Sequence, residues 1–301
     1  MTDLSLSGGQ MLDQASAILK QTQELLDQAL SSLKARTSQD GRVSPAKLDE
    51  HQLVSYELAL SWAECSSAGF LIAYAQRLQE QAPSAADFAT RLAGFFCAEA
   101  VTTTTSRLRA RPADFDLDAS AINAVTGSDP AAAFLQSQLA ADNAESLGER
   151  VLEREGDLGA DLLDENHTMM RDTFRRFADE VVAPLAEKVH RHDLDIPDEI
   201  LEPLKEMGMF GLSIPEAYGG LQEDGQEDTL GMCVVTEELS RGSLGAAGSL
   251  ITRPEILSRA LLKGGTEEQK QQWLPQFAVG EPLCAVAVTE PNYGSDVAGV
   301  R

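Results

Sequence analysis

The amino-acid sequence predicts a mainly α-helical protein, and three observations support this prediction. Apolar residues recur at helical spacing through the first half, helix start and stop residues mark shorter segments in the second half, and the first strand-like stretch comes only at residues 283–289. We expect a helical extension over residues 1–160, a helical domain over 161–281 and the beginning of a β-domain over 282–301.

Four helices are expected in the first region. The first covers residues 11–36, where apolar side chains form one stripe. The second is expected over residues 45–81, and the third begins after Ser84, which suits an N-cap position. The third contains the β-branched run 101–105, which is outweighed by the helical spacing on either side.

The remainder of this region reads as loop, helix and linker. Residues 112–128 are rich in Asp, Ala and Ser and predict a loop, after which a fourth helix is expected from Asp129 to about Arg154. Residues 155–164 read as a linker. The one histidine in this half, His51, has no nucleophile or base beside it, so a helical scaffold is the expectation.

Shorter helices are expected in the second region. The first has an apolar face from Met170 to Leu185, and Pro184 is placed to kink or end it. A second helix is expected over 198–207, closed by Gly208, and a third over 229–240.

The next helix is expected to begin at Pro254 and to end at Gly264–Gly265. Thr266 and Gln269 then have the spacing of a capping box. The strand at 283–289 follows a Gly-Glu-Pro turn.

Composition excludes several classes of function. With 48 acidic and 24 basic residues the formal charge is -24, which repels nucleic acid. No run approaches the roughly 20 apolar residues of a membrane span, and the N-terminus lacks the basic and apolar segments of a secretory signal. We therefore expect a cytoplasmic protein that binds neither membrane nor nucleic acid. The four cysteines have no metal-ligand spacing, so we expect buried thiols and no metal site: Cys65, Cys97, Cys233 and Cys284.

Three segments resemble acyl-CoA dehydrogenases: LKEMGMFGLSIPEAYGG at 204–220, GGTEEQKQQWLPQFAVGE at 264–281 and CAVAVTEPNYGSDVAGV at 284–300. Their order and spacing match the family's N-terminal helical domain and the start of its middle β-domain. The resemblance implies an FAD cofactor, an acyl-CoA substrate and electron-transfer flavoprotein as redox partner. It assigns these residues to the flavin site: Val286, Val288, Thr289, Gly294 and Ser295. It also places Ser295 near the thioester ligand.

The third segment makes physical sense on its own. A turn after a strand exposes backbone amides and the hydroxyls of Thr289 and Ser295, which suit the polar edge of a flavin. The alternative is an ordinary β-turn, since Pro, Asn and Gly are common turn residues. Tyr293 stands where the family usually has a small residue, so it could narrow the mouth of the pocket.

In the family, a glutamate of the C-terminal helical domain removes the α-proton while the β-hydride passes to the flavin. We expect that base beyond Arg301, and hence a 301-residue piece that is inactive alone and holds FAD weakly or not at all. Glu237 and Glu238 read as solvated or cap-side carboxylates, and Glu290 as part of the turn.

The long extension resembles a subgroup of the family that acts on a dicarboxylic acyl-CoA. In that subgroup the extension replaces helices that a neighbouring dimer supplies in tetrameric relatives, which implies a homodimer. A distal carboxylate needs a cation, and Arg253 is the candidate, with Arg241 and Arg259 as weaker ones. Two alternatives remain: another acyl-CoA dehydrogenase or oxidase with an unrelated extension, and a non-catalytic, truncated helical fragment.

Overall fold

The computed structural model describes residues 7–155, 157 and 159–300, and the chain divides into two compact units, Met1–Leu162 (unit 1) and Leu163–Arg301 (unit 2). Both units are helical, as the sequence predicts. The described residues contain one small sheet, an antiparallel pair formed by β1 (Ser38–Gln39) and β2 (Arg42–Val43).

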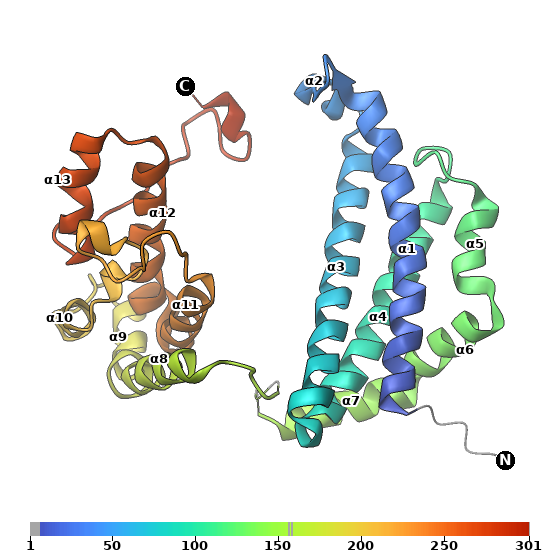
Figure 1. Ribbon diagram of the computed structural model, residues 1–301, viewed down its shortest axis with the longest axis horizontal. Helices are drawn as coiled ribbons and strands as arrows, with labels where there is room; N and C mark the ends of the chain where they lie inside the picture. Colours follow the sequence, from blue (N-terminus) through green and yellow to red (C-terminus); the bar gives the residue numbers. More distant parts are fainter. Residues whose placement is uncertain (1–6, 156, 158, 301) are drawn as a thin grey trace. The chain divides into compact units, whose positions relative to one another are not determined.

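Three long helices lie side by side in unit 1 (Figure 1): α1 (Gly8–Thr37), α3 (Gln52–Gln81) and α4 (Ala86–Ala110). The stripe predicted on α1 is buried against the other two helices except for Leu30, which is 43% exposed, and Leu12 and Leu26 are fully enclosed. Ser7 and Gln10 form a capping box at the start of α1. Apolar burial along three helices therefore builds one core for unit 1.

Shorter helices complete unit 1: α2 (Pro45–Asp49), η1 (Pro83–Ala85), α5 (Ala119–Gly127), α6 (Asp129–Gln138) and α7 (Ala141–Glu153). The single helix predicted over residues 45–81 is thus two helices, and so is the predicted fourth helix. The side-chain amide of Asn143 stabilises the break between α6 and α7, because its Nδ2 donates to the backbone carbonyl of Gln138 at 2.7 Å.

Two further predictions for unit 1 are wrong. Residues 112–128, predicted as a loop, contain α5, because Asp118 caps that helix and Ile122 and Val125 are buried in the core. Ser84 does not cap α4, since Pro83 begins a 3-10 turn that includes it.

α3 is the one helix of the described residues that is long and apolar enough to cross a membrane, judged by length and composition alone. Eight of its residues are buried, as in the core helix of a bundle. Three of its large apolar side chains are exposed at scattered positions: Leu53, Tyr56 and Phe70, of which Phe70 is 76% exposed.

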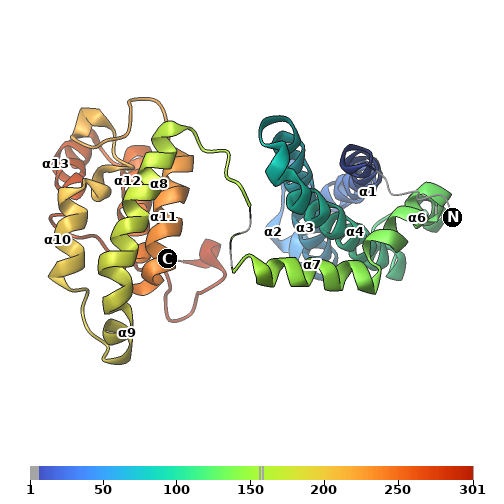
Figure 2. The same ribbon diagram turned by 90° about the horizontal axis from the view of Figure 1, so that it is seen from below.

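Unit 2 is built from helices of moderate length (Figure 2): α8 (Glu165–Phe177), η2 (Ala178–Val182), α9 (Ala183–Arg191), α10 (Asp198–Glu206), η3 (Met209–Gly211), η4 (Glu216–Tyr218), α11 (Thr229–Ser243), η5 (Leu244–Gly248), α12 (Ser249–Gly264), α13 (Glu267–Ala278) and η6 (Val297–Gly299). α8 and α11 lie side by side, and the π-helical turns η2 and η5 pack on α11.

Several local predictions for unit 2 are confirmed. Gly208 follows α10 in the left-handed conformation with φ 72°, and Thr266 and Gln269 form the capping box of α13. Pro184, by contrast, does not end the helix: it lies in the first turn of α9, directly after the π-helical turn η2, and helical backbone continues to Arg191.

Three predictions for unit 2 are wrong. α12 begins at Ser249, five residues before Pro254, because burial of Leu250 and Ile251 stabilises an earlier first turn. Residues 283–289 do not form a strand, since none of the described residues pairs with them. Cys233 is exposed rather than buried, because the buried face of α11 is formed by its neighbours, among them Met232 and Val235.

Candidate functional site

A small pocket lies in unit 2 where α12, the end of α13 and the following segment meet. The enclosed space is about 10 Å³, room for roughly one water molecule, so the pocket is a shallow depression. The lining residues are Phe210, Leu250, Arg253, Pro254, Phe277, Gly280, Pro282, Leu283 and Cys284.

Arg253 provides the positive charge of this pocket. Its guanidinium donates a weak hydrogen bond to Ser249 Oγ, at 3.4 Å, one turn earlier on α12. Within the described residues no carboxylate lies at ion-pair distance from Arg253. The charge is therefore available to an anionic group that enters the pocket.

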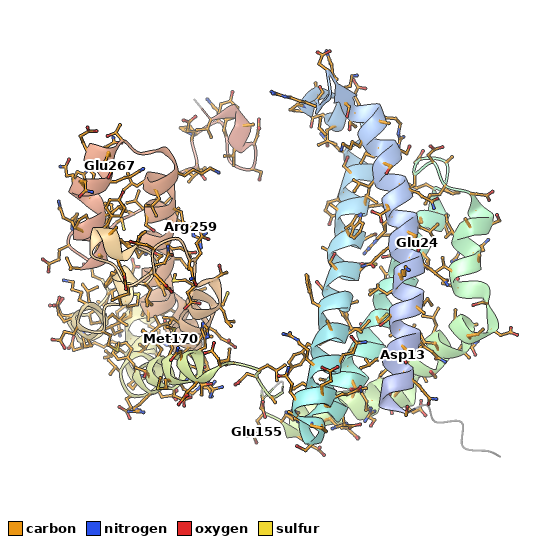
Figure 3. All side chains as sticks on the ribbon, in the orientation of Figure 1. Asp13, Glu24, Glu155, Met170, Arg259 and Glu267 are labelled. Carbon is orange, nitrogen blue, oxygen red and sulfur yellow. The ribbon has the colours of Figure 1, made fainter. Side chains whose placement is uncertain are left out.

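The two weaker candidates are already paired. Arg241 contacts Asp179 at 2.8 Å and Glu238 at 3.0 Å. Arg259 (labelled in Figure 3) contacts Glu227 at 2.8 Å and Glu255 at 3.1 Å. A ligand carboxylate would have to displace these partners, which makes Arg253 the best placed of the three.

Cys284 lines the same pocket and is half-buried. Burial raises the pKa of its thiol, and the positive charge of Arg253 acts in the opposite direction. Arg253 and Cys284 are therefore close enough to interact, although they are far apart in the sequence.

The predicted flavin-binding residues lie on an exposed segment. Val286 and Val288 are 44% and 51% exposed, and Thr289, Gly294 and Ser295 are also exposed. The predicted turn is present: the amide of Glu290 donates to the carbonyl of Tyr293 at 3.0 Å, and the amide of Tyr293 donates to the carbonyl of Glu290 at 3.2 Å. Thr289 and Ser295 flank this turn.

Tyr293 is not at the pocket. Its ring packs so closely on Gly299 that a Cβ atom there would lie 2.5 Å from the ring. Among the described residues, Tyr293 therefore packs within the loop of residues 290–299 and does not line the pocket beside Arg253.

The structure joins only part of the predicted site. It places Arg253 beside Leu283 and Cys284, at the beginning of the segment that leads to Thr289, but neither Thr289 nor Ser295 lines the described pocket. Sequence reasoning missed the aromatic walls, Phe210 and Phe277. Their signal was present, since each lies in an apolar stretch of the first two family-like segments.

The interpretation of Glu238 as a solvated carboxylate is wrong. Its side chain is 2% exposed and accepts hydrogen bonds from Arg175, the shortest at 2.7 Å, and from Arg241 at 3.0 Å. Glu237, one position earlier, is exposed as predicted. Because Glu238 is held by two arginines, it is an ion-pair partner rather than a candidate base.

Metal ligation finds no support in the described part of the chain, which has no cluster of three or more His, Cys, Asp or Glu side chains suited to an ion.

Comparison with known proteins identifies relatives of both units. The family description "Acyl-CoA dehydrogenase, N-terminal domain" matches residues 164–281. The chain is 39% identical over 97% of its length to (2S)-methylsuccinyl-CoA dehydrogenase of Cereibacter sphaeroides, of which it covers 53%.

Other relatives match a smaller part of the chain. The mitochondrial 2-methylacyl-CoA dehydrogenase of Solanum tuberosum is 34% identical over 46% of the chain and 33% of its own length. Isovaleryl-CoA dehydrogenase of the same plant is 36% identical over 46% of the chain and 33% of its own length. The chain thus spans from a third to about half of the length of these relatives.

Proposed function

We propose that the protein is an oxidoreductase that removes hydrogen from the α and β carbons of an acyl-CoA thioester, because residues 164–281 match the acyl-CoA dehydrogenase N-terminal domain. The observation that carries the proposal is the match of unit 2 to this domain, together with the family-like loop at residues 284–300.

We propose (2S)-methylsuccinyl-CoA as the substrate and mesaconyl-CoA as the product. The relative of that name matches 97% of the chain, unit 1 included, whereas the two plant relatives match 46%. The unpaired guanidinium of Arg253 in a small, largely apolar pocket supports a substrate with a second carboxylate.

We propose FAD as the cofactor, held in part by Val286, Val288, Thr289, Gly294 and Ser295. The hydroxyls of Thr289 and Ser295 are exposed and make no hydrogen bond within the described residues, so both are open to a ligand. When bound, FAD would accept the hydride from the β-carbon. Thr289 would donate to the ring edge, and Ser295 would orient the thioester.

The proposed partners follow from the same family. Electron-transfer flavoprotein would accept the electrons, and the protein would act as a cytoplasmic homodimer.

Substitution of Arg253 in the full-length protein tests the substrate. For Arg253→Ala we expect kcat/KM with (2S)-methylsuccinyl-CoA to fall about 100-fold, the effect of losing a charged hydrogen bond of roughly 1.5–3 kcal/mol. Turnover of butyryl-CoA should be unchanged, because that substrate has no distal carboxylate. Arg253→Lys should recover part of the loss, since lysine keeps the charge but not the bidentate geometry.

Arg191→Ala is the control, because Arg191 is an exposed residue of α9 outside the pocket. An equal loss on both substrates for Arg253→Ala, or no loss on either, would refute the role of Arg253. Turnover of butyryl-CoA but not methylsuccinyl-CoA by the unsubstituted protein would favour a different acyl-CoA dehydrogenase, and turnover with oxygen alone would favour an oxidase.

A further inference from the structure

His167, in the first turn of α8, lies between two carboxylates. Its Nδ1 is 2.8 Å from Oδ2 of Asp164, and its Nε2 is 2.9 Å from Oδ1 of Asp228. The imidazole side chain is 16% exposed. Nε2 is hydrogen-bonded to Asp228, whereas the contact of Nδ1 with Asp164 is a close charge pair without hydrogen-bond geometry.

Each of these carboxylates also caps a helix. Asp164 Oδ1 accepts a hydrogen bond from the amide of His167 at 2.9 Å, which caps α8. Asp228 Oδ1 accepts one from the amide of Gly231 at 2.8 Å, which caps α11. α8 and α11 pack against each other, so the imidazole connects two helix starts that are 61 residues apart in the chain.

This geometry favours the protonated ring. A neutral imidazole has one N–H and one lone pair, and that lone pair would face a carboxylate. The imidazolium ion keeps the Nε2–H donor to Asp228, and its positive charge attracts Asp164 as well. We propose that His167 is a proton-dependent clamp, whose positively charged ring holds the first turns of α8 and α11 together and whose deprotonation weakens this hold.

The charged groups around the ring agree with this role. Asp164 faces it from the start of α8 and Asp228 from the start of α11. Glu227, next to Asp228, is turned to Arg259 of α12 at 2.8 Å, and Arg171, one turn along α8, contacts Asp172 at 3.0 Å.

The pH range of the clamp follows from the direction of three shifts. The hydrogen bond to Asp228, and then the close contact with Asp164, raises the pKa of His167. Burial works to raise the pKa of Asp228, but the hydrogen bonds from His167 and from the Gly231 amide, with the charge of His167, together outweigh it and the pKa is lowered. The backbone amide of His167, and then its ring, lower the pKa of Asp164.

Because the pKa of His167 is raised by folding, its stabilisation is complete below the pKa of the unfolded chain, about 6.5. It is lost as the pH rises through the pKa of the folded chain. On the acidic side, the stabilisation is lost as the pH falls through the lowered pKa values of Asp164 and Asp228. α8 is the first helix of unit 2, so the release acts where the connecting segment joins that unit.

NMR titration of the histidine ring protons in the 301-residue chain tests the clamp. Asp228→Asn keeps a capping residue but removes the charge, so the titration midpoint of His167 should move to lower pH. An unchanged midpoint in this variant would refute the proposal.

Thermal unfolding provides the second measurement. The Tm of the unsubstituted chain should fall as pH rises from about 6 to about 9, and His167→Gln should lose most of this dependence. His192→Gln, an exposed position at the end of α9, is the matched control and should keep it. If His167→Gln and His192→Gln show the same pH dependence as the unsubstituted chain, the clamp does not exist.

Discussion

Gly220 sits in the tightest backbone contact of the described glycines. A Cβ atom built there would lie 1.8 Å from the carbonyl oxygen of Ile214. That carbonyl is also the acceptor for the amide of Gln222 at 3.0 Å, and the amide of Leu221 donates to Gly211 at 2.9 Å. The turn after Pro215 therefore closes only when position 220 has no side chain.

Gly220→Ala should destabilise unit 2 by about 3 kcal/mol, because the backbone of the turn has to move to admit a methyl group. Urea unfolding followed by circular dichroism measures the change. Gly245→Ala is the matched control, since the space around Gly245 is open and its φ is not positive. If the two variants were equally stable, the contact at Ile214 would be unimportant.

Single residues were the hardest to place from the sequence. Glu237 and Glu238 are adjacent and chemically alike, yet one is exposed and the other is enclosed by two arginines. Arg175 is 63 residues away from Glu238 in the sequence. No local pattern contains that pairing, because it depends on the packing of α8 against α11.

At the level of elements, the α13 capping box shows what local sequence can decide. Thr266 Oγ1 accepts from the amide of Gln269 at 3.3 Å, and the side chain of Gln269 accepts from the amide of Thr266 at 2.9 Å. Both partners lie within one turn, so the prediction needed no tertiary information and is confirmed.

Thr266→Ala should cost about 1 kcal/mol, because the amide of Gln269 loses its acceptor. Thr266→Ser retains the hydroxyl and should stay within roughly 0.5 kcal/mol of the unsubstituted chain. Guanidinium unfolding with Trp273 fluorescence follows α13 itself, which contains that residue. Equal stability of the serine and alanine variants would show that the cap contributes nothing.

Elements that depend on distant partners were missed. α5 forms because Ile122 and Val125 reach the core of unit 1, and its sequence alone resembles a loop. The predicted strand at 283–289 has the composition of a strand, but a strand exists only with a neighbour. The start of α12 was placed at Pro254 because proline is common at helix starts, whereas burial of Leu250 decided the outcome.

At the level of the whole molecule, the two units have separate cores. The buried cluster of unit 1 runs from Met11 to Phe134, and those of unit 2 from Phe174 to Ala278. The two tryptophans of the chain divide between them, Trp62 in unit 1 and Trp273 in unit 2. Each unit therefore carries its own fluorescent probe.

Leu26→Ala should lower the stability of unit 1 by about 2–5 kcal/mol, because it leaves a cavity in a fully buried position. The transition reported by Trp62, in a chain with Trp273→Phe, should move to lower denaturant. The transition reported by Trp273, in a chain with Trp62→Phe, should not move.

Leu152→Ala, at an exposed position of unit 1, is the control and should change neither transition. A shift of both transitions by Leu26→Ala would mean that the units unfold as one.

Pro254 removes one backbone hydrogen bond from α12 beside Arg253. Because proline has no amide hydrogen, it cannot donate to the carbonyl of Leu250. The first turn of α12 is therefore held by the buried side chains of Leu250 and Ile251, and the position of the guanidinium depends on that packing.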